Sequence, residues 1–233
     1  YSLGKLTKSL GIPISDRHRA TGDALATVKL FKLLLAKDDK KTIIQNAIKY
    51  FDKRLEKEKL KNLIAEIPNV IGVFYVHDTN GKVIYIGKGK NIKFEINNLF
   101  VKTSRRSLKI QERASSVSFE KTGNELFTRL KYYIELENLT PKFNFKKKFK
   151  HNKDAFNNDN FLLFDKGRDI EEHAVILIEN NEVSGYGYTN LAYQENNLDI
   201  LKTILNKIEH KEIAKTITKN FLDRNRVKKI VRL

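Results

Sequence analysis

The chain has 233 residues, 40% of them hydrophobic, which is enough for a sizeable core and for two modest folded units. Its 45 Lys and Arg against 28 Asp and Glu give a formal charge of +17, so nucleic acid is the leading partner class and an acidic membrane surface the second. The absence of cysteine excludes disulfides, thiolate chemistry and cysteine-ligated zinc. Because no apolar run is long enough to span a bilayer and the chain start lacks a secretory core, we expect a cytoplasmic protein with no membrane partner.

Residues 1–37 are predicted to form a helix, a loop and a second helix, since leucines recur at helical spacing on both sides of the break at "GIP". The sequence begins inside the first of these helices, so we expect a fragment of a longer protein. Residues 38–67 are rich in lysine but keep apolar residues at helical spacing. This pattern predicts a helical connector and not a disordered tail.

From residue 68 the pattern becomes that of a compact α+β unit, predicted to end at residue 150. The segments "VIGVFYVHD" and "KVIYIG" are rich in β-branched and aromatic residues and flank the turn sequence "TNG". They predict an antiparallel hairpin. A helix over 91–100, a strand at "SSVSFEK" and a helix over 124–138 complete the unit.

Residues 151–160 read as a polar linker, and residues 161–233 as a small α+β extension. Three short strands are predicted at "FLLFDKGRD", "HAVILIEN" and "VSGYGYTNL", with turns at "DKG" and "NNE". Two helices between residues 197 and 222 are expected to follow.

The segment "HRATGDA" places His18 five residues before Asp23, which begins a helix. Two-metal phosphodiester hydrolysis needs a base that titrates near neutrality and hard carboxylate ligands. The segment resembles the third sequence motif of DnaQ-type 3′-5′ exonucleases, which have an RNase H-like fold. The resemblance implies that His18 is the general base and that Asp23 binds Mg²⁺ or Mn²⁺ in the complete exonuclease. The alternative is an aspartate that caps a helix beside an exposed loop histidine.

The hairpin carries a more specific signal. "GVFYVHDTNGKVIYIGKGKNI" resembles the GIY-YIG domain of UvrC-type excision nucleases and homing endonucleases, with "GVF" standing for the first triplet and "YIG" for the second. The later "TPKFN" resembles the "RPKYN" that closes that domain in UvrC-like proteins. Concordance of the spacing, the hairpin and the closing motif favours this fold over an unrelated hairpin with surface lysines.

Active members of that family use tyrosines of the hairpin, a lysine after the second triplet, an arginine on the next helix and a metal-binding glutamate on a later helix. Tyr85 and Lys88 match and are the candidate catalytic residues. Four positions depart from the pattern, because a phenylalanine replaces the first tyrosine, a glutamate the arginine, a leucine a polar ring and a tyrosine the metal ligand: Phe74, Glu95, Leu99 and Tyr132. We therefore expect this unit to have lost its cutting activity and to need no metal. The alternative is an active metal-dependent, structure-selective endonuclease with another ligand, such as Glu135 or Glu137.

Basic residues near these motifs are candidate contacts to DNA phosphates: Lys88, Lys90, Arg105, Arg106, Lys109, Lys146, Lys147 and Lys148. Phenylalanines interleave the last three, as in a strip where rings stack on exposed bases. The alternatives are the polar face of a helix for the arginines and a solvated linker for the lysine run.

The order of the motifs resembles a known bacterial fusion of a DnaQ-like exonuclease with a GIY-YIG domain. The sequence thus predicts an α+β chain: the end of an exonuclease domain, a degenerate GIY-YIG domain with a small antiparallel sheet flanked by helices, and a small extension. We expect it to bind DNA within a replication or repair nuclease. A scaffold that docks replication or repair proteins is a third hypothesis.

Overall fold

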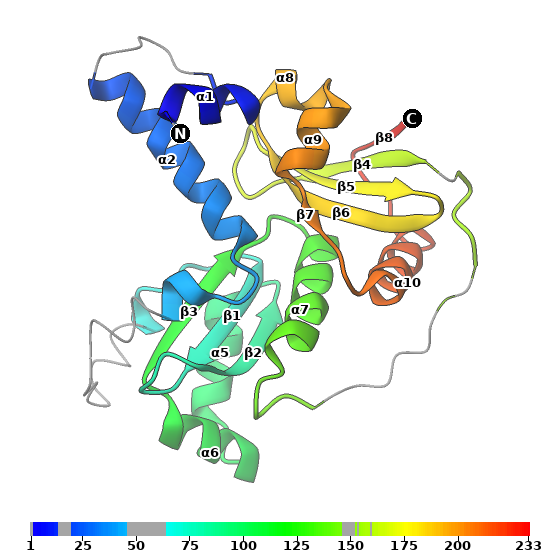
Figure 1. Ribbon diagram of the computed structural model, residues 1–233. Coiled ribbons are helices and arrows are strands. Elements are labelled where there is room, and N and C mark those ends of the chain that lie inside the picture. Colours follow the sequence, from blue (N-terminus) through cyan, green and yellow to red (C-terminus); the bar gives the residue numbers. More distant parts are fainter. Residues whose placement is uncertain (1, 14–19, 46–63, 146–151, 153, 159) are drawn as a thin grey trace. The chain divides into compact units, whose positions relative to one another are not determined.

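Figure 1 shows the computed structural model of the chain, which describes all residues except 1, 14–19, 46–63, 146–151, 153 and 159. The chain forms two compact units, each made of segments that are distant in the sequence. The central unit contains Asp39–Asp154 and His210–Arg226, and the terminal unit contains Tyr1–Asp38, Ala155–Glu209 and Val227–Leu233. Both units are α+β with an antiparallel sheet, as the sequence predicts.

The central unit is built on a three-stranded antiparallel sheet. Its strands are β1 (Gly72–His77), β2 (Val83–Gly89) and β3 (Ser116–Lys121), in the order β2-β1-β3. The predicted hairpin and the predicted third strand are confirmed. β2 lies at the edge of this sheet (Figure 1), and four of its seven residues are buried whereas Tyr85, Lys88 and Gly89 are partly exposed.

The turn of the hairpin is fixed by Asp78, whose Oδ1 accepts hydrogen bonds from the backbone N–H groups of Asn80 (2.9 Å) and Lys82 (3.0 Å). Gly81 follows with a φ of +76°, a left-handed conformation that favours glycine. A side chain there would also meet the carbonyl oxygen of Gln45, 2.5 Å from an ideal Cβ. The "TNG" sequence therefore allows both the tight turn and the close approach of the Gln45 backbone to Gly81.

Three helices cover the two faces of this sheet. They are α5 (Ile92–Val101), α6 (Arg105–Arg113) and α7 (Glu125–Leu139), and each begins after a side-chain N-cap: Asn91, Ser104 and Asn124. Apolar residues of α5 and α6 pack with Phe74 and Val76, whereas α7 packs with Val73 and Tyr75. Neighbouring residues of β1 point to opposite faces, so one strand contributes to both cores. The two predicted helices are confirmed.

A further helix, α10 (Lys211–Leu222), joins the central unit from the C-terminal part of the sequence. It contacts α7, and His210 just before it forms a hydrogen bond with Asn138 (3.1 Å). Thr216 accepts a hydrogen bond from the backbone N–H of Asn152 (3.0 Å). The sequence predicts this helix but assigns it to the C-terminal extension.

The terminal unit contains a five-stranded antiparallel sheet in the order β7-β6-β5-β4-β8. Its strands are β4 (Phe161–Lys166), β5 (His173–Glu179), β6 (Glu182–Thr189), β7 (Asn206–Lys207) and β8 (Lys229–Arg232). The three predicted strands are confirmed, and the turn predicted at "NNE" lies between β5 and β6, where Asn180 and Asn181 have positive φ. The short β7 and β8 were not expected.

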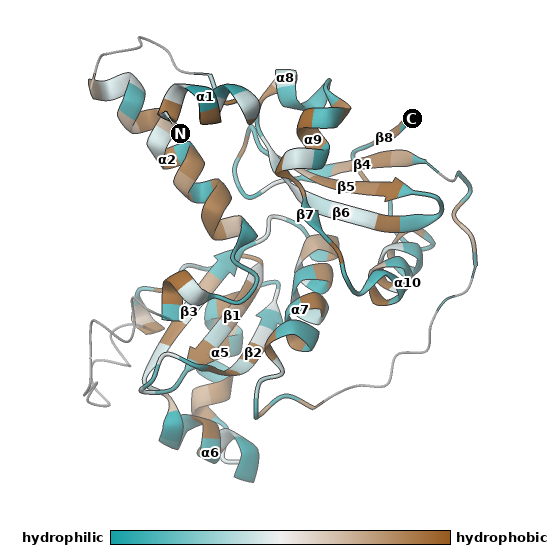
Figure 2. Cartoon of the chain, viewed as in Figure 1, coloured by the Kyte–Doolittle hydropathy of each residue, from teal (hydrophilic) through white to brown (hydrophobic). Residues whose placement is uncertain are grey.

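Four helices accompany this sheet: α1 (Leu3–Ser9), α2 (Ala20–Lys37), α8 (Ala192–Glu195) and α9 (Leu198–Ile204). Leu10, Leu177 and Leu201 lie in one hydrophobic core, against which Leu30 and Leu33 of α2 pack. The brown, hydrophobic strand β5 lies in the middle of that sheet in Figure 2. Residues 1–37 and the C-terminal sheet thus share one core, although the sequence places them in separate segments.

The end of α2 is fixed to β7 by a hydrogen bond from Asn206 Nδ2 to the Ala36 carbonyl (2.7 Å). Of the predicted connector 38–67, residues 42–45 and 64–65 are helical, and 46–63 lie outside the described residues. Within the described part of the chain, no helix has the length and apolar character needed to cross a membrane.

Candidate nucleic-acid interface

A cleft of about 210 Å³ opens beside the edge strand β2, between β2 and the helices α5 and α6. We call it the Tyr85 cleft. Its lining combines residues of the two family triplets with charged residues of both helices: Phe74, Tyr85, Gly87, Lys88, Glu95, Leu99, Lys102, Ser104, Arg106 and Ser107. The structure therefore brings Tyr85, Lys88 and three of the four departing positions together in one site.

Phe74 serves packing in this cleft. Its ring lies across Gly87, where an ideal Cβ would be only 2.1 Å from the ring, and 6.0 Å from the ring of Tyr85, centroid to centroid. The side chain is buried and has no hydroxyl. Glycine is required at position 87 because no larger residue leaves room for the phenylalanine ring.

Tyr85 keeps its hydroxyl in an environment that favours the neutral phenol. Burial raises its pKa above the ordinary value, the Arg106 guanidinium lowers it, and the Glu95 carboxylate raises it again. Glu95 therefore lies close enough to affect the Tyr85 hydroxyl electrostatically, at the position where the family resemblance implies an arginine. Leu99, four residues on, is buried in the core beneath the cleft.

Asn144, from the closing "TPKFN", holds the strand that carries Tyr85. Its Oδ1 accepts from the Ile86 N–H (2.8 Å) and its Nδ2 donates to the Ile86 carbonyl (2.8 Å). The side chain thus replaces a neighbouring strand at the edge of the sheet. Sequence reasoning used this motif for the resemblance alone and missed that it supports the site.

Tyr132 lies beside Lys88, whose Nζ is 5.4 Å from the centre of the Tyr132 ring. Burial raises the pKa of the Tyr132 phenol, and the neighbouring Tyr85 and Tyr133 raise it further. At neutral pH the group is therefore a protonated phenol. The position that the resemblance assigns to a metal-binding glutamate holds a neutral aromatic side chain next to the candidate lysine.

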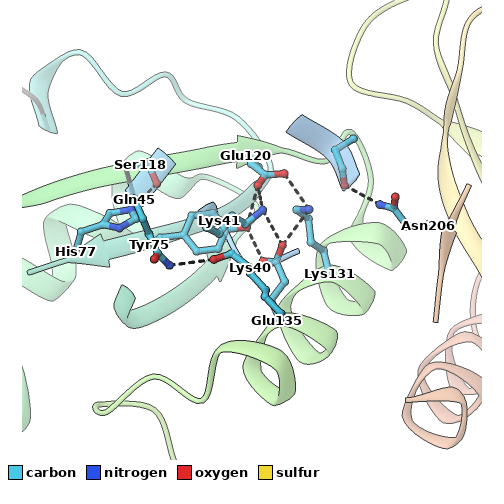
Figure 3. Close-up of polar contacts among 11 residues, drawn as sticks. Lys40, Lys41, Gln45, Tyr75, His77, Ser118, Glu120, Lys131, Glu135 and Asn206 are labelled. Atoms are coloured by element: carbon cyan, nitrogen blue, oxygen red, sulfur yellow. Dashed lines mark hydrogen bonds and ion pairs between the residues drawn. The ribbon is translucent and has the colours of Figure 1, made fainter. Parts of the chain in front are cut away.

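The carboxylate one turn further along α7, Glu135, is not available to the cleft. It is fully buried, accepts a hydrogen bond from the Tyr75 hydroxyl (2.5 Å), and pairs with Lys41 (3.0 Å) and Lys131 (3.0 Å). Figure 3 shows that these residues and Glu120 converge on one point. We call the four charged residues, Lys41, Glu120, Lys131 and Glu135, the buried ion cluster.

Glu120 completes the cluster from β3. It pairs with Lys41 and with Lys131 (2.9 Å), so two lysines neutralise two glutamates. Burial by itself raises the pKa of the Glu120 carboxyl, but Lys131 and Lys41 outweigh it and lower the pKa to about 2. Nothing in the sequence spacing indicated this cluster, because its members come from the connector, a strand and a helix.

Carboxylate and water oxygens are the ligands that Mg²⁺ prefers. Among the described residues that line the Tyr85 cleft, Glu95 is the one carboxylate. No group of three or more His, Cys, Asp or Glu side chains in the described ranges could hold a metal ion. The cleft therefore supplies one carboxylate, Glu95, and this residue is not at the position where the family resemblance implies the metal ligand.

The residues predicted to contact DNA lie in different parts of the structure. Lys88 and Arg106 line the cleft, and Lys90 extends from the end of β2 with its side chain 82% exposed, 3.4 Å from Glu125. Arg105 and Lys109 are exposed on α6. Lys146, Lys147, Lys148 and His18 lie outside the described residues. Asp23 lies in the first turn of α2, in the terminal unit.

A three-stranded sheet with the Tyr85 hairpin at its edge, flanked by α5, α6 and α7, defines a GIY-YIG-like domain. Its relatives among known proteins are UvrC proteins. The UvrABC system protein C of Campylobacter jejuni is 31% identical over 99 residues, which cover 39% of this chain and 16% of that protein. The protein of the same name from Psychrobacter cryohalolentis is 42% identical over 48 residues, 21% of this chain and 8% of that protein.

The GIY-YIG N-terminal endonuclease domain of UvrC from Thermotoga maritima, solved with its catalytic magnesium, covers 39% of this chain and 100% of that domain, at 24% identity and a TM-score of 0.37. No family model matches the chain. The chain spans less than a fifth of the length of the curated relatives it matches. Its central part is similar to the GIY-YIG domain of UvrC.

Proposed function

We propose that the central unit binds DNA through the Tyr85 cleft and does not cleave it. The observation that carries the proposal is Tyr132, a neutral phenol beside Lys88 where the family resemblance implies a metal-binding glutamate. The substitute one turn away, Glu135, is bound by two buried lysines. Loss of a metal ligand or of the arginine typically costs several orders of magnitude in rate.

The charge of the cleft supports binding. Lys88, Lys102 and Arg106 line it against the single carboxylate of Glu95, a net charge of +2 from three cations and one anion. Cations that neutralise phosphates release counterions, and each phosphate contributes about −0.9 to the slope of log affinity against log salt for duplex DNA. If each of these three side chains neutralises one phosphate, log affinity should fall against log salt concentration with a slope of about −3.

The test measures binding and cleavage with the full chain on labelled flaps, forks and bubbles. We expect affinity that falls steeply with salt, and intact DNA after incubation with Mg²⁺ or Mn²⁺. Metal-dependent nicking that Tyr85→Phe abolishes would overturn the proposal in favour of an active structure-selective endonuclease. Weak binding that salt does not change would instead favour a protein-interaction scaffold.

We also propose that this chain is part of a bacterial, cytoplasmic replication or repair nuclease whose catalysis resides in a DnaQ-type exonuclease domain. The specific observation in favour is the surface of α2, the helix that begins near Asp23. Its side chains Leu25, Val28, Phe31 and Leu34 are 49–56% exposed. Such an apolar helix face usually packs against further protein.

This second proposal is tested on the longer protein, with His18 as general base and Asp23 as a ligand of Mg²⁺ or Mn²⁺. We expect metal-dependent removal of 3′-terminal nucleotides that Asp23→Ala abolishes, with Asp38→Ala as the control at the other end of α2. Activity that survives Asp23→Ala would contradict the assignment. The same result would leave the DNA-binding proposal for the central unit unaffected.

A further inference from the structure

Arg106 lies between two aromatic rings at the mouth of the Tyr85 cleft. Its guanidinium carbon is 5.2 Å from the centre of the Tyr85 ring and 4.7 Å from that of Phe145. Arg106 belongs to α6 and stands outside the positions that the family motifs specify. The two rings hold the planar guanidinium in one position, whereas the guanidinium of an exposed surface arginine moves among several rotamers.

The guanidinium also has unused hydrogen-bonding capacity. The Nε of Arg106 is buried, and it has no hydrogen-bond partner among the described residues. A buried donor without a partner is costly, and an arginine presents its donors in a planar fork that fits phosphate oxygens. An anion in the cleft would supply the missing acceptor.

The surroundings of Arg106 favour an anion. Ser104 and Ser107, from the start of α6, line the same cleft, and the first turn of this nine-residue helix contains no acidic residue. Lys88 and Lys102 add two positive charges. The hydroxyls of Ser104 and Ser107 are hydrogen-bonded to each other (2.8 Å), so one hydroxyl hydrogen of the pair remains to donate to an anion. Three cations against the single Glu95 carboxylate favour a bound anion.

Phe145 supplies the second part of the argument. Its side chain is 74% exposed, which is unusual for a phenylalanine, although one side of the ring is near the guanidinium. An exposed ring next to a phosphate-binding cation is the arrangement on which unpaired bases stack. Bases in a duplex are already stacked on each other and do not offer a free face.

We infer that the Tyr85 cleft binds one nucleotide of an unpaired DNA strand, with its phosphate on Arg106 and its base on Phe145. The inference rests on the proposed DNA binding and adds the substrate class, single-stranded DNA. In this inference Arg106, on α6, makes the phosphate contact that the family resemblance assigns to an arginine on α5. Glu95 stands at that α5 position and cannot bind a phosphate. Duplex binding through the exposed face of α6 is the competing outcome.

The experiment compares a labelled oligonucleotide as a single strand and as a duplex of the same sequence by fluorescence anisotropy. The variants are Arg106→Lys, which keeps the charge but loses the planar fork, and Phe145→Leu, which keeps an apolar side chain but loses the ring. Lys82→Ala, which removes an exposed lysine from the hairpin turn of the same unit, is the matched control. Circular dichroism and thermal unfolding establish that each variant is folded.

We expect single strands to bind at least tenfold more tightly than the duplex, and each test variant to lose about tenfold in single-strand affinity, the scale of one stacked base or one bidentate phosphate contact. Lys82→Ala should lose no more than a few-fold in affinity for either DNA. Equal affinity for both forms, or Arg106→Lys binding like the parent protein, overturns the inference while leaving the DNA-binding proposal in place. Absence of binding to any DNA at low salt overturns both.

Discussion

The two faces of the central sheet use similar charged residues in opposite ways. On the α7 face, Lys41 and Lys131 are almost fully buried, and each pairs with both glutamates of the ion cluster (Figure 3). Beside the face covered by α5 and α6, Lys102 and Arg106 line an open cleft that contains a single carboxylate. Lys88 lines the same cleft from the edge strand, with its Nζ near the Tyr132 ring of α7.

The comparison teaches that net charge alone does not locate a binding surface. A lysine buried with two carboxylates contributes nothing to the field outside the protein, whereas a lysine that lines a cleft does. The buried ion cluster also bears on the proposed loss of the metal ligand. The carboxylate of α7 that lies nearest in sequence to Tyr132 neutralises buried lysines, so withdrawing it toward the cleft would leave those lysines unpaired.

The largest effect is expected from a substitution in the buried ion cluster on the α7 face. Glu135→Leu removes the carboxylate between Lys41 and Lys131 and leaves an excess positive charge in the core. We expect the free energy of unfolding to fall by about 3–5 kcal/mol, measured by urea denaturation. Glu112→Gln, exposed on α6, is the control and should change it by less than about 0.5 kcal/mol. A loss below about 1 kcal/mol for Glu135→Leu would show that the cluster is not an interdependent unit.

The pH dependence of stability follows from Glu120. Its pKa is about 2 in the folded protein and near 4.5 when unfolded, so the folded state favours the charged form. The stabilisation is complete above pH 4.5 and is lost as pH falls toward 2, by on the order of 3 kcal/mol. Urea unfolding between pH 6 and pH 3 should show this loss. The Glu120→Gln variant should be less stable at pH 6, and its free energy of unfolding should change less with pH. If the variant shows the same pH dependence as the parent protein, Glu120 is not the group responsible.

The smallest effect is expected for DNA affinity, from a substitution in the Tyr85 cleft. Glu95→Gln removes the one carboxylate of the cleft and should raise DNA affinity about three- to fivefold, since a single unit charge near a phosphate in a solvated cleft is worth about 1 kcal/mol. Anisotropy titrations at low salt measure the change, and the gain should shrink as salt rises. If affinity falls instead, Glu95 supports the binding residues and does not oppose the phosphate.

Much of the fold could be predicted from local patterns. The strands β1 to β6, the helices α5 and α7 and the Tyr85 hairpin are encoded by residue spacing, turn residues and N-caps within each segment. The short strand β8 could not be predicted, because Lys229–Arg232 is a strand only through its pairing with β4. The same holds for β7, a two-residue strand next to β6.

For the candidate site, the motifs identified Tyr85, Lys88 and the four departing positions, because those residues occur at fixed spacing along the chain. The position of Arg106 between two rings could not be read in this way. It depends on how α6 packs against the hairpin and on the path of the chain after Asn144. The assignment of His18 and Asp23 to an exonuclease stays a prediction.

By itself, the sequence determined that a polycationic chain contains a GIY-YIG-like hairpin, since such signals depend on residue identity and short-range spacing. The replacement of the family's arginine and metal ligand stays a prediction from the same motifs. The tertiary structure decided which charges are neutralised. Lys41 meets Glu120 across 79 positions, and Asn206 reaches Ala36 across 170. Contacts at such separations arise from folding around shared cores, so no local pattern encodes them.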